Sequence, residues 1–150
     1  MSGSTFKHIL VPHDFSETAS AALAYALDLA AKLGARVTVL HVYDAVGYGF
    51  PEGWALTAEV AGQIEAAASQ ALDGVVERAR KSGVTVDRVL RQGPAWSEIE
   101  GFARAANVDL IVMGTHGRRG LSRVLLGSVA ERVVRVSPCP VLTVHGPSGK

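Results

Sequence analysis

The chain has 150 residues, 48% of them hydrophobic and 19% charged, with a formal net charge of +1. This predicts one globular domain, residues 1–150, with a hydrophobic core, and excludes a general electrostatic attraction to nucleic acid or to an anionic membrane. No apolar run approaches the roughly 20 residues that span a bilayer, residues 1–5 lack the basic-then-apolar pattern of a signal peptide, and the single Cys139 cannot form an internal disulfide, so we expect a cytoplasmic protein with neither nucleic acid nor membrane as a partner.

Short apolar stretches alternate along the chain with segments of helical periodicity. Taken in order, the expected elements are a strand over residues 7–12, a helix from the turn at 13–17 to 33, a strand over 36–42, a helix over about 56–81, a strand over 84–90, a helix over 96–106, a strand over 108–113, a helix over 128–136 and a strand over 141–144. This alternation predicts an α/β fold, a single-domain open parallel sheet of five strands with helices on both faces.

The residues at the ends of elements and the polarity of each strand add detail. Asp14 with Glu17 three residues later fits a capping box for the first helix, and Ser16 is a rival N-cap. Residues 84–90 alternate between polar and apolar side chains, which is typical of an edge strand. Residues 108–113 are continuously apolar, which is typical of a central strand.

Two strand ends carry groups suited to binding a ligand. In a doubly wound sheet, ligands sit beyond the carboxyl ends of the strands, where the strand order reverses. Pro12, His13 and Asp14 follow the first strand, and a glycine-rich segment that begins at Gly114 follows the fourth. If these strands are neighbours at the reversal, Asp14 and residues 114–117 face a common crevice.

The glycine-rich segment has the composition of a phosphate-binding loop. Gly114 and Gly117 permit a ligand to approach the backbone closely, and Gly127–Ser128 stands where free N–H groups of the last helix favour an anion. The structural alternatives are that the glycines serve only as turn residues and that Ser128 only caps the helix, in a capping box with Glu131.

Motifs of several other site types are absent or weak. The chain contains neither the Gly-x-x-x-x-Gly-Lys-Ser/Thr of a P-loop nor the Gly-x-Ser-x-Gly of an acyl-transfer serine. His13, Asp14 and His116 could approach one cation, but no tight ligand spacing supports a dedicated metal site. A divalent ion that bridges phosphate groups is the more plausible metal.

The order of motifs resembles the universal stress protein family. The nucleotide-binding branch of this family carries Gly-x2-Gly-x9-Gly-Ser/Thr, and Gly114, Gly117, Gly127 and Ser128 match it residue by residue. Residues 9–16 resemble the family's first strand and acidic turn, and residues 133–144 resemble its closing segment. The likeness covers nearly the whole chain, apart from residues 43–82, which lack a distinctive motif.

The resemblance implies a fold, a ligand and an assembly. It implies the strand order 3-2-1-4-5 and ATP, with Mg²⁺ or Mn²⁺, in the crevice between strands one and four. Asp14 would contact the adenosine, the Val42 backbone would face the adenine beside Met113, and the glycines with Ser128 would hold the phosphates. The complete set of residues expected at the nucleotide is Pro12, His13, Asp14, Val42, Met113, Gly114, His116, Gly117, Arg118, Gly127, Ser128 and Val129.

Similar proteins form homodimers through the last strand, and an exposed apolar edge at residues 141–144 would invite such pairing. Three functions then remain open. The leading hypothesis is an adenine-nucleotide-binding regulatory protein of the stress response with little turnover. The others are a slow ATPase or phosphotransferase, with Asp14, His13 or His116 as a general base, and a dimeric adaptor whose pocket is vestigial.

Overall fold

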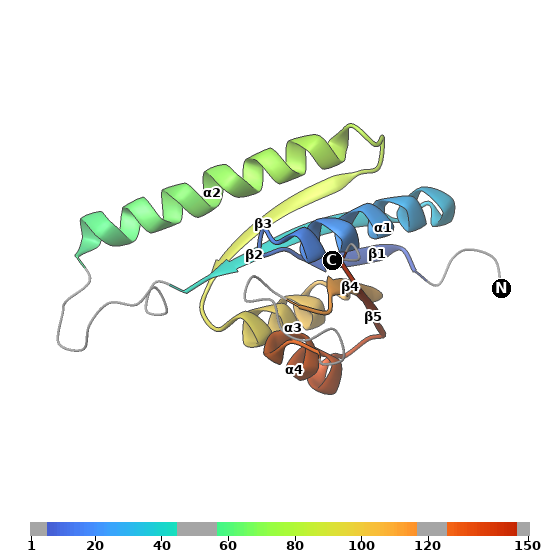
Figure 1. The fold of residues 1–150 in the computed structure, drawn as a ribbon. Coiled ribbons are helices and arrows are strands. Elements are labelled where there is room, and N and C mark those ends of the chain that lie inside the picture. The colour runs from blue at the N-terminus through green and yellow to red at the C-terminus, as the bar shows by residue number, and fades with distance from the viewer. Residues whose placement is uncertain (1–5, 45–56, 117–125, 147–150) are drawn as a thin grey trace.

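The computed structural model describes residues 6–44, 57–116 and 126–146. All five of its strands are parallel and form one sheet in the order β3-β2-β1-β4-β5, which confirms the order that the family resemblance implied (Figure 1). The strands are β1 (His8–Pro12), β2 (Arg36–Tyr43), β3 (Val86–Gln92), β4 (Leu110–Gly114) and β5 (Val141–Val144). The helices are α1 (Glu17–Leu33), α2 (Ala58–Arg80), α3 (Ala95–Ala105) and α4 (Ser128–Val136).

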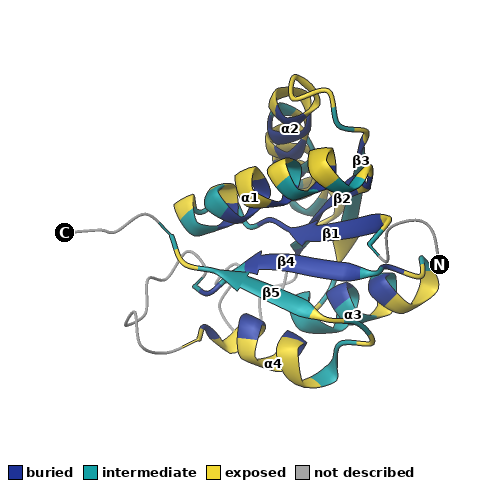
Figure 2. Cartoon of the chain, turned by 90° about the vertical axis from the view of Figure 1, so that its right-hand side faces the viewer, coloured by how far each residue is buried: buried dark blue, intermediate teal, exposed yellow. Residues whose placement is uncertain are grey.

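Two helices cover each face of the sheet, so the core has two layers (Figure 2). β1 is buried along its whole length, and its side chains alternate between the layers because successive residues of a strand point to opposite faces. Ile9 and Val11 pack with α1 and α2, whereas Leu10 packs with α3 and α4. β4 is also buried and lies between β1 and β5, and β3 lies at an edge, so both expectations drawn from strand polarity are confirmed.

The start of α1 settles the choice between two N-caps. Ser16 has extended backbone geometry and its side chain accepts a hydrogen bond from Ala19 N at 3.1 Å, so Ser16 is the cap and the capping box of Asp14 with Glu17 is wrong. Asp14 accepts instead from Ser16 N at 3.0 Å, which closes a tight turn before the helix. Gly34 ends α1 in the left-handed conformation, as expected.

Two other expectations need correction. β3 begins two residues later than expected and ends two residues later. Ser82 Oγ accepts from Val84 N, which keeps the chain in a turn, while Gly93 N donates to Tyr43 O, which extends the pairing with β2. In α4 the N-cap is Gly127, and Glu131 N donates to the carbonyl of Gly127, so the capping box between Ser128 and Glu131, the structural alternative for this segment, does not form.

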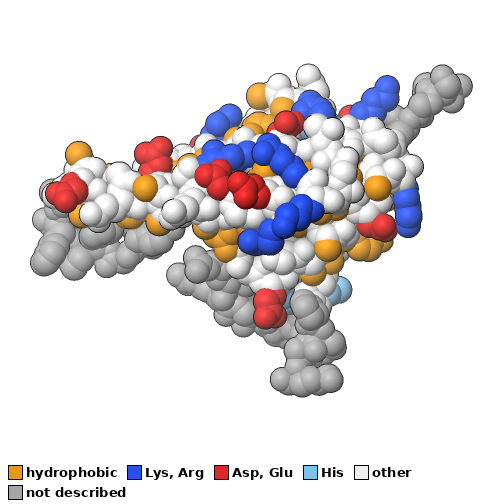
Figure 3. All heavy atoms as spheres, turned by 90° about the horizontal axis from the view of Figure 1, so that it is seen from above, with side chains coloured by type: hydrophobic (Ala, Val, Ile, Leu, Met, Phe, Trp, Pro, Cys, Tyr) orange, Lys and Arg blue, Asp and Glu red, His pale blue; other side chains and the backbone are white. Residues whose placement is uncertain are grey.

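The outer face of the α1–α2 layer carries basic and acidic side chains close to one another (Figure 3). Exposed ion pairs such as Lys32–Asp28 and Arg88–Asp73 lie there. This interspersion accords with the small net charge and gives this face no strong field of one sign. None of the described helices is long and apolar enough to cross a membrane.

Candidate functional site

A cavity of about 470 Å³ lies beyond the carboxyl ends of β1 and β4, the neighbouring strands at which the strand order reverses. Its lining comes from the ends of β1, β2 and β4 and from the first turns of α1, α3 and α4. Every expected site residue that the structure describes lies in this lining: Pro12, His13, Asp14, Val42, Met113, Gly114, His116, Gly127, Ser128 and Val129. Gly117 and Arg118 lie outside the described residues.

Sequence reasoning missed part of this lining. The additional residues are mostly small or apolar: Ala19, Leu40, Ala95, Ile99, Thr115 and Ala130. Ala95 and Ile99 stand four residues apart on one side of α3, a spacing that the sequence shows. No feature of the sequence, however, indicates that this helix rather than another covers the crevice. We call the apolar side chains of Leu40, Val42, Ile99 and Met113 the floor of the cavity, and Asp14 with the first turn of α4 its polar rim.

The turn between β1 and α1 places Asp14 on the rim. His13 N donates to Leu40 O at 2.8 Å, which continues the pairing of β1 with β2. Phe15 N donates to His13 Nδ1 at 3.0 Å, and Phe15 has a φ of 69°, a left-handed conformation that is a genuine outlier for a bulky residue. Hydrogen bonds of both neighbouring residues therefore hold the backbone around Asp14, and the carboxylate itself accepts from Ser16 N.

His13 is buried, and its hydrogen bonds fix its protonation state. Burial lowers the pKa of His13 to about 4, more than the nearby Asp14 carboxylate raises it, so the ring is neutral at pH 7. Because a backbone N–H only donates, Nδ1 must be the acceptor, and the proton of the neutral ring is on Nε2. In this conformation the acceptor nitrogen of His13 is engaged by Phe15 N, and Nε2–H remains as a donor on a residue of the cavity lining.

Gly114, at the end of β4, allows α1 to approach the sheet closely. A Cβ added at Gly114 would lie 2.6 Å from Thr18 Cγ2 and 3.1 Å from the Thr18 carbonyl carbon. Both distances are shorter than van der Waals contact, so the absence of a side chain here has a packing reason. The same bare backbone forms part of the cavity lining.

The first turn of α4 supplies unpaired donors to the cavity. Gly127 N donates to Thr115 O at 2.6 Å, and Thr115 N donates to Val144 O at 3.0 Å, so the helix start is tied to the ends of β4 and β5. In an α-helix the next N–H groups, those of Ser128, Val129 and Ala130, have no partner inside the helix. All of these residues line the cavity, where the positive end of the helix favours an anion.

The described residues do not assemble a dedicated metal site. Nowhere in the described ranges do three or more His, Cys, Asp or Glu side chains gather as metal ligands require. His13 Nδ1 is engaged by Phe15 N, and His116 Nδ1 lies 3.2 Å from Thr115 Oγ1. Asp14 is the carboxylate in the described lining, so a divalent ion there would be coordinated mainly by a ligand's own oxygens and by water.

Comparison with known proteins gives a consistent assignment. A sequence model of the universal stress protein family matches residues 5–145. The chain is 37% identical over 145 residues to universal stress protein MJ0531 of Methanocaldococcus jannaschii, an alignment that covers 95% of this chain and 84% of that protein.

Solved structures agree. That of MJ0577, also from Methanocaldococcus jannaschii, matches with a TM-score of 0.84 at 32% identity and covers 97% of this chain and 100% of that chain. A universal stress protein of Archaeoglobus fulgidus, solved in complex with dAMP, matches with a TM-score of 0.67 at 25% identity over 94% of this chain and 99% of that chain. By sequence and by fold, the chain belongs to the universal stress protein family.

Proposed function

We propose that residues 1–150 form one nucleotide-binding domain that binds ATP in the cavity beyond β1 and β4. The observation that carries this proposal is the composition of the described lining, which combines an apolar floor with the carboxylate of Asp14 and the N-terminus of α4. A purine ring suits the floor, a ribose hydroxyl suits a carboxylate acceptor, and a phosphate suits the helix N-terminus. The dAMP complex of the Archaeoglobus fulgidus relative supports an adenine nucleotide as the ligand.

In this proposal the adenosine lies over Val42 and Met113, and Asp14 accepts hydrogen bonds from the ribose. The phosphates lie against Gly114 and the N–H groups of residues 128–130, with His116 near them. Gly117 and Arg118, which the structure does not describe, stay predicted ligand residues. Mg²⁺ or Mn²⁺ would be coordinated by phosphate oxygens, with Asp14 as the available protein carboxylate. His13 Nε2 donates to the ligand or to a water molecule beside it.

We propose a regulatory role for the bound nucleotide in the stress response, in the cytoplasm, with little turnover. A water molecule that attacks a phosphate needs a base within hydrogen-bond reach, and the neutral His13 is arranged as a donor. Two alternative functions remain. One is a slow ATPase that uses Asp14 or His116 as the base, and the other is an adaptor protein whose pocket is vestigial.

Calorimetric titration with ATP and Mg²⁺ tests the proposal, and two variants assign the ends of the site. Asp14→Asn keeps the side-chain oxygen that Ser16 N requires but removes the charge, so ATP and adenosine should both bind about tenfold more weakly. Asp28→Asn, which removes an exposed carboxylate from the C-terminal half of α1, outside the cavity lining, is the matched control and should bind as wild type does.

Ser128→Pro tests the phosphate end. Proline is favoured at the first position of a helix, and Gly127 already has a backbone conformation that proline tolerates after it. The substitution removes one N–H and the hydroxyl, so ATP should bind about tenfold more weakly while adenosine binds unchanged. Ser128→Ala removes the hydroxyl alone. If wild-type protein does not bind ATP at millimolar concentration, the nucleotide proposal is wrong. Chromatography of the nucleotide after the titration shows whether the bound ATP is also hydrolysed.

We also propose a homodimer formed through β5. The two edges of the sheet differ. β3 contains Asp87, Arg88 and Arg91, and Arg80 Nε donates to Val86 O at 3.0 Å. Thr85 O faces β2, so Val86 O faces outwards, and Arg80 therefore blocks a carbonyl of the free edge. β5 reads Val-Leu-Thr-Val, carries no charge and is half-buried. An apolar edge of this kind favours pairing with another chain.

The hydrogen bonds of β5 show which of its backbone groups are free for pairing and so limit the register. Ile111 N donates to Pro140 O and Thr115 N to Val144 O, so the backbone groups of Val141 and Thr143 point away from β4. Antiparallel pairing with Leu142 opposite the same residue of a second copy would join Val141 of each copy to Thr143 of the other. Each such pair exchanges both N–H···O=C bonds.

Exposed apolar side chains flank this edge. Tyr25 is 55% exposed and lies two turns after Thr18, the residue of α1 that approaches Gly114 and Gly146. Val134 is 47% exposed, on the flank of α4 opposite Arg132, which stacks on Trp96 of α3. Both residues would be covered in a dimer through β5.

Sedimentation of two matched variants tests the dimer. Thr143→Pro removes an outward N–H without removing a bond to β4, and the variant should be monomeric at concentrations at which the wild type is dimeric. Thr143→Val keeps the N–H and should remain dimeric. Dimerisation that survives in the proline variant would exclude this register.

A further inference from the structure

His41 is a buried histidine on β2 that lies behind the candidate site rather than in it. It is 6% exposed and stands between Leu40 and Val42, both of which line the cavity. Because side chains alternate along a strand, His41 points to the opposite face of the sheet, towards α1 and α2. Direct contact with a ligand in the cavity therefore does not explain this histidine.

The ring of His41 binds the backbone of the β1–α1 turn. Nδ1 lies 2.7 Å from the carbonyl oxygen of His13. A carbonyl only accepts, so Nδ1 carries a proton and donates. The residue that precedes Asp14 is thus held through its carbonyl by β2, in addition to the bond from its own N–H to Leu40 O.

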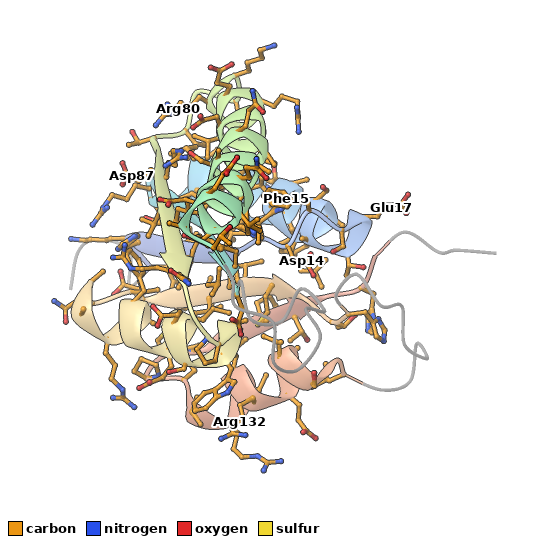
Figure 4. The ribbon with its side chains drawn as sticks, turned by 90° about the vertical axis from the view of Figure 1, so that its left-hand side faces the viewer. Asp14, Phe15, Glu17, Arg80, Asp87 and Arg132 are labelled. Atoms are coloured by element: carbon orange, nitrogen blue, oxygen red, sulfur yellow. The ribbon has the colours of Figure 1, made fainter. Side chains whose placement is uncertain are left out.

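The same ring packs against the residue that follows Asp14. The ring of Phe15 lies over that of His41 with a centroid separation of 4.3 Å and an interplanar angle of 38°. Phe15 adopts a φ of 69°, which a bulky residue keeps only where its surroundings hold it. Phe15 packs into the α1–α2 layer of the core, while Asp14 lies on the other side of the turn and lines the cavity (Figure 4).

We propose that His41 is a positioning residue for nucleotide binding, which holds His13 through a hydrogen bond and Phe15 through ring packing so that the Asp14 carboxylate between them faces the cavity. The inference rests on the proposed nucleotide function and extends it to a residue outside the lining. Without His41, the left-handed Phe15 loses its packing partner and the His13 carbonyl loses its donor. The turn then samples orientations in which Asp14 does not meet the ribose.

Two substitutions separate the parts of this role. His41→Asn places an amide N–H close to the position of Nδ1–H, so it keeps the donor for His13 O and removes the aromatic ring. His41→Phe keeps a ring for Phe15 and removes the donor. In calorimetric titration with ATP and Mg²⁺, we expect His41→Phe to bind about tenfold more weakly than wild type, and His41→Asn to recover part of that loss.

A double-mutant cycle with Asp14→Asn shows whether His41 acts through Asp14. If it does, His41→Phe weakens ATP binding about tenfold in the wild-type background and hardly at all in the Asp14→Asn background. Equal losses in both backgrounds would mean a general structural role and would overturn the inference. Ser128→Pro is the control, since a loss at the phosphate end should add to that of His41→Phe.

A failure of this inference can be distinguished from a failure of the proposed function. Wild-type protein that does not bind ATP refutes the proposed function, whereas wild type that binds and His41→Phe that binds equally well refutes the inference alone. If His41→Phe does not fold, Phe15→Leu replaces it in the same cycle, because it removes the ring contact and leaves the bond from His41 to His13 O in place. Additive losses of Phe15→Leu and Asp14→Asn would likewise overturn the inference.

Discussion

A buried histidine lies at each end of β1, His8 as the first residue of the strand and His13 directly after the last, and the two ends differ in what the surrounding residues do. At the amino end, Asp109 Oδ2 accepts from Lys7 N and from His8 N, both at 2.9 Å, and His8 Nε2 pairs with Thr38 Oγ1 at 2.7 Å. Side chains at this end form hydrogen bonds with the backbone and with one another. At the carboxyl end, His13 belongs to a turn that borders a cavity.

The difference follows from the topology. In a parallel sheet each helix that follows a strand begins at the carboxyl end, so the N-termini of α1, α3 and α4 all face that end, and the first N–H groups of α4 have no partner inside the helix. The amino end receives helix C-termini. The same residue type is therefore structural at one end of β1 and part of the candidate site at the other, and matched substitutions at the two ends measure this contrast.

The largest expected effect is the acid sensitivity that His13 causes. Burial lowers its pKa from 6.5 to about 4, so between these values the unfolded chain binds a proton that the native protein does not. Stability from this source is complete above pH 6.5, and about 3 kcal/mol of it is lost as the pH falls through that window to the folded pKa. Urea unfolding of wild type and His13→Asn across this window measures the difference, since Asn keeps an acceptor for Phe15 N and does not titrate.

His8→Gln is the matched variant at the other end. Burial, with a smaller contribution from Arg36, lowers the pKa of His8 as well, so this histidine destabilises the protein in acid in the same direction. The glutamine amide can take the place of Nε2 opposite Thr38. A pH dependence that persists in full in His13→Asn would contradict the assignment to His13. The charged or titratable groups that act on the His13 ring are Asp14, His41 and Arg78, and all three are unchanged in His13→Asn.

The next effect contrasts two glycines. At the carboxyl end, Gly114→Ala forces a Cβ to within 2.6 Å of Thr18 Cγ2, which should cost about 2 kcal/mol of unfolding free energy and also weaken ATP binding. Thr18→Ala removes the closest contact and should restore part of the stability, but not all, because the Thr18 carbonyl carbon remains 3.1 Å away.

At the amino end, Gly34 has open space around it but a φ of 69°, so Gly34→Ala should cost about 1 kcal/mol through backbone strain. Thr18→Ala should leave that cost unchanged. If Thr18→Ala restored stability equally in both glycine variants, the steric explanation for Gly114 would be wrong.

Most of the fold could be predicted from the sequence, because periodicity, glycine stops and the apolar strands all indicate the same α/β alternation. The site could be predicted only where a motif names its residues, as with Asp14 and Gly127–Ser128. The contribution of α3 through Ala95 and Ile99, and the contacts on which the proposed role of His41 rests, depend on tertiary packing. The helix caps were ambiguous because Asp14 and Ser16 both have capping side chains, and the geometry of the turn decides between them.

A smaller effect is expected where Asp109 closes the amino end. Asp109→Ala removes the acceptor of Lys7 N and His8 N, one exposed and one partly buried, and should lower the unfolding free energy by about 1.5 kcal/mol. Asp109→Asn keeps a neutral acceptor and should lose less. ATP affinity, measured by calorimetry in both variants, should equal that of wild type, because the cavity lies at the other end of β1. A change in affinity would mean that the two ends are coupled.

The smallest effect concerns His8 and Thr38. His8 Nδ1 is buried and makes no well-aligned hydrogen bond among the described residues, so this ring carries a desolvation cost that its interaction with the Ala106 backbone offsets only in part. Thr38→Val removes the partner of Nε2 and should cost about 1 kcal/mol. Replacing both residues, His8→Leu with Thr38→Val, removes the polar pair together with the buried Nδ1 and should leave the unfolding free energy near that of wild type.

A double variant less stable than Thr38→Val alone would show that the histidine stabilises the amino end in another way, for instance through its edge-on contact with Phe102. Nearly neutral replacement would show that a histidine is dispensable at this end of β1, and the same apolar replacement of His13, whose Nδ1 accepts the Phe15 N–H, should not be neutral.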